Sequence, residues 1–242
     1  MEKKYRLLEN DTKVVGGKTL YRIEALRDFA DVQKGDKGGY VESEENLSHE
    51  GNCWVYDNAW VYGYARVYGN AQVYGYAVVY NYAQVFGNAR VSGNARVSDN
   101  AEIYGNAWVC GNARVSDNAE IFGNARVSDN AEIYGNARVC GNARVFGYAE
   151  VYGYAEVYGD AEIRSTRDYV VLKNIWSSGR YFTYTRSNKM WKVGCFYGTG
   201  EELIAKAYRD SEVSGREYER VVRYVEAMYA DLENDERQEA KK

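Results

Sequence analysis

A six-residue unit recurs from Cys53 to Arg164 without an insertion, and this repeat constrains the fold more than any other feature of the chain. Each unit reads small residue, outward residue, Val or Ile, outward residue, and then two turn residues. The small position is Cys53 and then Ala at every sixth residue to Ala161, which makes nineteen hexads in one register. Such a repeat indicates a solenoid, in which each unit buries its apolar residues by stacking on its neighbours.

Each Ala-x-Val-x segment alternates as a strand does, and the Gly, Asp and Asn that follow tolerate the positive φ of a tight corner. Gly-Asn is also a hairpin signal, so an antiparallel meander fits the local pattern too. The Ala/Val face of a long meander would have nothing to pack on, whereas a parallel β-helix turns these residues into one core. We expect a mainly β fold with a triangular parallel β-helix of about six to seven coils. The absence of Pro agrees, because each Pro would remove a ladder donor.

The units GNARVS, GNAEIY and GNARVC resemble the hexapeptide repeat of left-handed β-helix proteins. That family places an aliphatic residue two positions after a small one, as Ala-x-Val does here. The resemblance covers about half of the chain and implies a left-handed helix; the best-known members are acyltransferases, including sugar N-acyltransferases. The flanking segments, which include GDKGGYVESEENLSHEGNCWVY, resemble uncharacterised hexapeptide proteins of Gram-positive gut bacteria and their prophages.

The segments outside the repeat predict two further domains. Residues 1–46 are expected to form an N-terminal β cap with a hairpin around Gly16-Gly17, and residues 47–164 form the β-helix. Residues 165–242 are expected to form a small C-terminal α+β domain that caps the other end of the solenoid. The segments Thr199–Glu202 and Ser214–Glu217 both have the pattern of a capping box, so each predicts the start of a helix.

The resemblance to hexapeptide acyltransferases implies a His general base that acts on an acceptor beside an acyl thioester. His49 is the one His in the sequence. It precedes Val55 by six residues, so the register predicts an inward aliphatic position and favours a packing role at the end of the core. These enzymes often carry a loop between coils, and none interrupts residues 53–164. We therefore favour a protein without catalysis and without a cofactor; the enzyme alternative is an acyltransferase that uses His49 with acetyl-CoA or another acyl-CoA.

The four cysteines predict neither a disulfide framework nor a metal site. Cys53 occupies an inward small position. Cys110 and Cys140 point outward but lie on different faces, because their separation is not a multiple of eighteen residues. Cys195 is isolated in the C-terminal domain.

One coil holds three hexads, so residues eighteen apart lie on the same face. The outward residues that follow each Val or Ile therefore form three columns, one on each face. One column is almost continuously aromatic and is called the aromatic stripe: Tyr68, Phe86, Tyr104, Phe122 and Tyr158, with Cys140 between the last two. Stacking within the chain explains such a column. A long exposed apolar column also suggests an interface, so we expect a homo-oligomer, with a trimer favoured over a dimer by the family resemblance.

Residues 165–200 combine six Arg and Lys residues with eight aromatic residues, a composition typical of phosphate or single-strand binding. The candidate binding residues are Arg180, Arg186, Lys189, Trp191 and Lys192. The same composition suits a basic sheet packed on the acidic helices expected in residues 201–239.

Three functions remain open on these observations. We favour a scaffold that acts through protein–protein interaction, which the prophage resemblance extends to a phage-encoded factor binding a host protein. The alternatives are the acyltransferase and a nucleic-acid or nucleotide binder that uses residues 165–200. The net charge of −4, the lack of a long apolar run and the lack of a secretory signal after Met1 lead us to expect a cytoplasmic protein without membrane contact.

Overall fold

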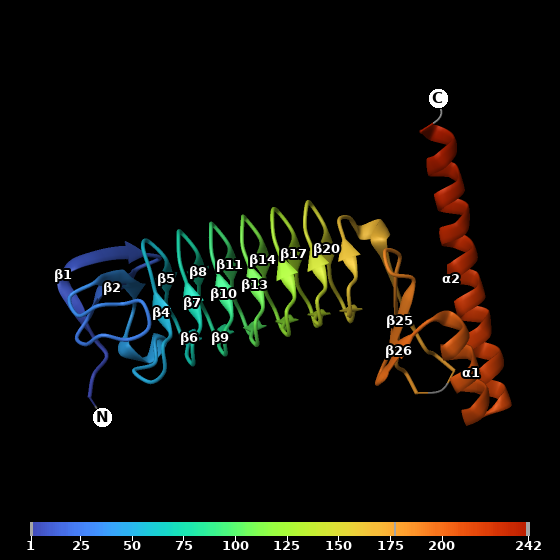
Figure 1. The fold of residues 1–242 in the computed structure, drawn as a ribbon, viewed down its shortest axis with the longest axis horizontal. Helices are drawn as coiled ribbons and strands as arrows, with labels where there is room; N and C mark the ends of the chain where they lie inside the picture. The colour runs from blue at the N-terminus through green and yellow to red at the C-terminus, as the bar shows by residue number, and fades with distance from the viewer. Residues whose placement is uncertain (1, 177, 241–242) are drawn as a thin grey trace. The chain divides into compact units, whose positions relative to one another are not determined.

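The computed structural model describes residues 2–176 and 178–240. The chain divides into two compact units, residues 1–166 and residues 167–242. The first unit contains an N-terminal cap and the repeat segment, here called the shaft, and the second is an α+β unit (Figure 1).

Nineteen two-residue strands build the shaft, and each except the last three pairs in parallel with the strand eighteen residues further along (Figure 1). Face 1 comprises β4 (Trp54–Val55), β7 (Gln72–Val73), β10 (Arg90–Val91), β13 (Trp108–Val109), β16 (Arg126–Val127), β19 (Arg144–Val145) and β22 (Glu162–Ile163). Face 2 comprises β5 (Trp60–Val61), β8 (Val78–Val79), β11 (Arg96–Val97), β14 (Arg114–Val115), β17 (Glu132–Ile133) and β20 (Glu150–Val151). Face 3 comprises β6 (Arg66–Val67), β9 (Gln84–Val85), β12 (Glu102–Ile103), β15 (Glu120–Ile121), β18 (Arg138–Val139) and β21 (Glu156–Val157). The parallel pairing confirms the β-helix and excludes the meander.

The core of the shaft consists of the small and aliphatic columns, in which each residue from Ala59 to Ile163 is at most 1% exposed. The corner residue two positions after each inward Val or Ile of the repeat except Ile163 has a positive φ. It is mostly Gly, but Asp occupies this position at sites such as Asp99 and Asp117. Asn and Asp tolerate this conformation better than other residues with a side chain. The core and the corners therefore follow the predicted register.

The N-terminal cap is a hairpin of β1 (Tyr5–Val15) and β2 (Lys18–Ala25) that turns at Gly16-Gly17, as predicted. Strand β3 (Lys37–Val41) pairs antiparallel with β2 and parallel with β5, so the cap extends the face 2 sheet (Figure 1). A short 3-10 helix, η1 (Glu44–Asn46), then leads into the first coil. The cap thus supplies partners for the strand edge at the start of the shaft.

The register of the first coil differs from the prediction. Leu47 pairs with Val67, twenty residues away, whereas Val55 pairs with Val73, eighteen residues away. The corner between Leu47 and Cys53 therefore holds two extra residues, and Leu47 occupies the aliphatic position. The prediction of an inward aliphatic position for His49 is wrong, because His49 lies in this longer corner.

The second unit contains a four-stranded antiparallel sheet and two helices. The strands are β23 (Tyr169–Lys173), β24 (Tyr181–Thr185), β25 (Met190–Val193) and β26 (Phe196–Gly198); the helices are α1 (Gly200–Asp210) and α2 (Glu212–Glu239), and a 3-10 turn, η2 (Thr166–Asp168), precedes them. Their core includes Phe182, Trp191 and Val222.

The two predicted helix starts have different outcomes. The capping box of Thr199 and Glu202 is present at α1. The predicted start at Ser214 is wrong, because the Ser211 side chain caps α2 and accepts a hydrogen bond from the Ser214 N–H. A hydroxyl residue three positions before Ser214 therefore places the start of α2 earlier.

Candidate functional site

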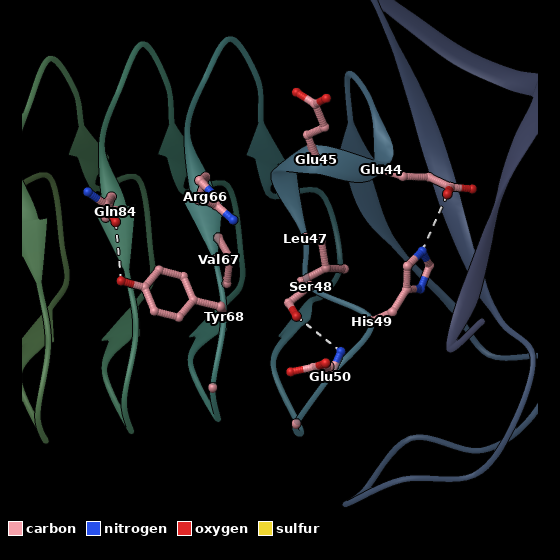
Figure 2. Close-up of a pocket in the computed structure, with 12 residues that line it drawn as sticks. Glu44, Glu45, Leu47, Ser48, His49, Glu50, Arg66, Val67, Tyr68 and Gln84 are labelled. Atoms are coloured by element: carbon pink, nitrogen blue, oxygen red, sulfur yellow. Dashed lines mark hydrogen bonds and ion pairs between the residues drawn. The ribbon is translucent and has the colours of Figure 1, made fainter. Parts of the chain in front are cut away.

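A cavity of about 720 Å³ lies beside His49, between the longer corner and the first coils of face 3. Figure 2 shows Leu47 and Ser48 facing Tyr68 and Val67 across the cavity, with Gln84 one coil further along. Tyr68 donates a hydrogen bond from its hydroxyl to Gln84 Oε1 at 3.2 Å. This cavity is the candidate site, because it contains the predicted catalytic residue.

Both ring nitrogens of His49 have partners within the cap. Nδ1 lies 3.2 Å from the Lys4 backbone N–H, which can only donate, so Nδ1 accepts. The ring proton is therefore assigned to Nε2, which lies 3.4 Å from Glu44 Oε2 (Figure 2). The ring also stacks on Tyr5, with centroids 4.3 Å apart. In this arrangement neither nitrogen has a free lone pair for a substrate proton.

The rim of the cavity is acidic. Glu44, Glu45 and Glu50 line it, opposed by Arg66. A hydrogen bond from Lys3 holds the pKa of the Glu44 carboxyl below its ordinary value, and His49 adds to this effect. With Lys3 paired to Glu44 and Arg66 opposite, Glu45 and Glu50 leave the rim with a small net negative charge, which disfavours anionic ligands.

A buried lysine closes the core beneath this site. Lys4 is fully buried, and its Nζ donates to the Cys53 carbonyl at 2.8 Å and lies 3.2 Å from Cys53 Sγ. Burial lowers the pKa of Lys4 and raises the pKa of the Cys53 thiol. Cys53 is a core residue as predicted, and Lys4 fills the end of the core with a polar group that satisfies otherwise unpaired carbonyls.

The aromatic stripe stacks along face 3. Tyr68, Phe86, Tyr104 and Phe122 form a continuous ladder with ring centroids 4.8 to 4.9 Å apart. The four rings are half-buried, while Tyr158 is 37% exposed. The predicted stacking within the chain is therefore present, and the stripe still offers its ring edges to solvent.

The most exposed aromatic residues of the shaft lie elsewhere, at corners where Tyr replaces Asn. They are Tyr64, Tyr76, Tyr82, Tyr148 and Tyr154, with exposed fractions from 49% to 81%. Sequence reasoning sorted the outward strand positions and passed over the corner positions. The signal was available, because each of these tyrosines follows a corner Gly or Asn in the hexad.

The prediction of a basic aromatic binding surface is wrong for Trp191, and other residues of that set contact groups within the second unit. Trp191 is fully buried in the core of the second unit. Arg186 contacts Glu236 at 2.5 Å, and Lys189 lies 3.9 Å from Glu233, so both face acidic residues of α2. Lys192 donates to the Gly194 carbonyl, and Arg180 lies against Gly194. The alternative of a basic sheet facing acidic helices describes Arg186 and Lys189 better than an open binding surface does.

Within the described residues, no group of three or more His, Cys, Asp or Glu side chains could hold a metal ion. The helices of the described ranges include none with the length and apolar character needed to cross a membrane.

The repeat, the parallel pairing and the buried Ala/Val columns define a β-solenoid built from a hexapeptide-like repeat. Residues 65–81, 83–99, 95–111 and 137–153 match the family model of the YdcK beta solenoid repeat. A relative from Escherichia coli strain K12, named as the uncharacterised acetyltransferase YdcK, is 50% identical over 38 residues. That match covers 16% of this chain and 12% of the relative.

Proposed function

We propose that this protein is a non-catalytic scaffold that acts through protein–protein interaction along its shaft. The observation that carries this proposal is the His49 ring, whose nitrogens are engaged by Lys4 and Glu44. A general base needs an open lone pair at the reacting atom. The acidic rim of the cavity also disfavours the phosphates of an acyl-CoA. We expect the partner to be a protein, and a host protein where this chain acts as a phage-encoded factor.

The scaffold proposal includes self-association through the aromatic stripe, with a trimer favoured over a dimer. The shaft is a rigid support, so burying the stripe against a second copy costs little ordering entropy. The test replaces Phe86 and Phe122 by Glu, and the expected result is a lower mass in light scattering with an unchanged circular dichroism spectrum. The matched control replaces Tyr80 and Tyr134 on face 2 by Glu. A monomeric parent protein, or an equal effect of both pairs, contradicts this assembly.

An acyltransferase is the second candidate, because the Escherichia coli relative carries that name and His49 lines a cavity. Incubation with acetyl-CoA separates the two candidates. The scaffold proposal expects no thermal stabilisation and no acyl transfer to amine or hydroxyl acceptors. Transfer that is lost in His49→Ala but retained in Ser48→Ala would overturn the scaffold proposal in favour of the enzyme.

A further inference from the structure

A groove of about 710 Å³ runs along face 1 of the shaft, and it shares no lining residue with the cavity beside His49 or with the aromatic stripe. One wall is the column of outward strand residues, Gln72, Arg90, Trp108 and Arg126, on adjacent strands of face 1. The other wall is a ladder of corner asparagines, which we call the asparagine ladder: Asn52, Asn70, Asn88, Asn106 and Asn124. None of the residues that line this groove is acidic.

The asparagine ladder leaves polar atoms directed outward. Nδ2 of each Asn from Asn70 to Asn124 donates to Oδ1 of the Asn one coil further on, at 3.0 to 3.2 Å. Each amide from Asn88 to Asn124 uses one of two N–H groups and one of two acceptor lone pairs in the ladder. These side chains are exposed, so the remaining donor and acceptor recur once per coil, roughly every 4.8 Å.

The arginine wall carries positive charge over the same stretch. Arg90 and Arg126 are exposed and lie two coils apart, roughly 10 Å along the shaft. Trp108 lies between them, with the Arg126 guanidinium 5.3 Å from its ring centroid. Further along the column Arg144 pairs with Glu162 at 3.1 Å, so the basic character ends there. The groove therefore fits a linear anion with polar groups along its length.

We propose that this groove binds a linear acidic polysaccharide, with uronate carboxylates on Arg90 and Arg126 and sugar hydroxyls on the asparagine ladder. Guanidinium groups bind carboxylates in a two-pronged geometry. A pyranose with its glycosidic oxygen is about as long as one coil rise, so successive sugars stay in step with successive asparagines. This inference goes beyond the proposed protein–protein function and uses a different face.

Other polyanions fit the groove less well. Side chains on one face of an extended peptide recur roughly every 6.6 to 6.8 Å, out of step with the coils. Single-stranded nucleic acid gains affinity by stacking on aromatic faces. Trp108 is the one aromatic residue that lines the groove, its ring is contacted by Arg126, and its Nε1 donates to Ser92.

The test measures retention of polymannuronate oligosaccharides by the full chain, against polyglutamate and oligodeoxythymidylate at equal charge concentration. We expect polymannuronate to bind most tightly and Arg90→Gln with Arg126→Gln to weaken it at least about tenfold. The matched control, Arg66→Gln with Arg138→Gln, removes the same charge from face 3 and should change binding little. Melting temperatures of both double variants establish that the fold is intact.

Three results would overturn this proposal: no retention of polymannuronate, equal or tighter binding of polyglutamate or oligodeoxythymidylate, and equal losses in the two double variants. A second variant separates hydroxyl recognition from charge. Asn106→Ala should weaken polymannuronate binding and leave the weaker polyglutamate binding unchanged. An equal effect on both polymers contradicts the role of the asparagine ladder.

Discussion

The shaft and the C-terminal unit differ in how a residue's position in the sequence determines its environment. In the shaft, position within the hexad decides whether a side chain is buried, as the Ala and Val columns show. In the C-terminal unit, strand β25 also alternates, but its buried side, with Trp191 and Val193, is the one that packs against helix residues such as Val222. A solenoid separates its core from its surface by a fixed rule, whereas an α+β unit settles each side chain by packing between elements.

The largest expected effect tests the independence of the two units. Trp191→Ala removes the largest buried side chain of the C-terminal core and should destabilise that unit by about 3–5 kcal/mol. Limited proteolysis should then cleave residues 167–240 while residues 53–164 stay protected. Simultaneous cleavage in the shaft contradicts the comparison.

The next effect tests the rule for the shaft. Ala113 is fully buried and Arg114 is exposed beside it. Ala113→Leu overpacks a corner of the narrow core and should cost about 1–3 kcal/mol or more, whereas Arg114→Leu should be close to neutral. Denaturant unfolding measures both variants, and equal midpoints would refute the inward assignment.

Alkaline pH should affect the C-terminal unit through two buried tyrosines. Burial, with nearby acids, raises the pKa of Tyr184 and of Tyr229 to about 12. In the unfolded chain these tyrosines have the ordinary pKa of 10.0, so above pH 10 they release protons that the folded unit still holds. The free energy of unfolding of this unit therefore falls as the pH rises from 10 towards 12. Tyr229→Phe should reduce this slope by up to about 1.4 kcal/mol per pH unit. Unfolding curves between pH 9 and 11 check this, and an unchanged slope contradicts it.

The smallest effect separates backbone strain from crowding at the corners. Gly111 and Gly153 both have positive φ, but an added Cβ at Gly111 would lie 2.8 Å from the Asp129 nitrogen, while at Gly153 it would meet nothing within 4 Å. Both Ala variants carry the left-handed cost of about 1–2 kcal/mol. Gly111→Ala should melt at the lower temperature, because it adds a clash between coils. A lower melting temperature for Gly153→Ala would argue against stacked corners as the source of the difference.

The sequence was sufficient to predict the shaft, because every hexad repeats the same order of small, outward, aliphatic and turn residues. It failed at His49, because the prediction counted six residues back from Val55, whereas the corner after Leu47 holds two extra residues. The partners of His49 could not be predicted, because Lys4 and Tyr5 reach it through the fold of the cap over a separation of more than forty residues. The prediction that Trp191 lies on a binding surface failed for a related reason, because basic and aromatic composition does not distinguish the inward from the outward side of a strand.

The eighteen-residue pairing also limits how this surface can change in evolution. A duplication of three hexads lengthens every outward column by one step and preserves which side chains are neighbours, as Arg90 and Trp108 now are. A duplication of one hexad between Arg90 and Arg126 turns all later residues onto the next face, so Arg126 would leave the line of Arg90. The ladder would continue, because Asn100 and Asn118 occupy the equivalent position at another corner. The number of hexads between two outward residues therefore decides whether they share a face, and such a duplication would rearrange the charged columns while leaving the core and the corners intact.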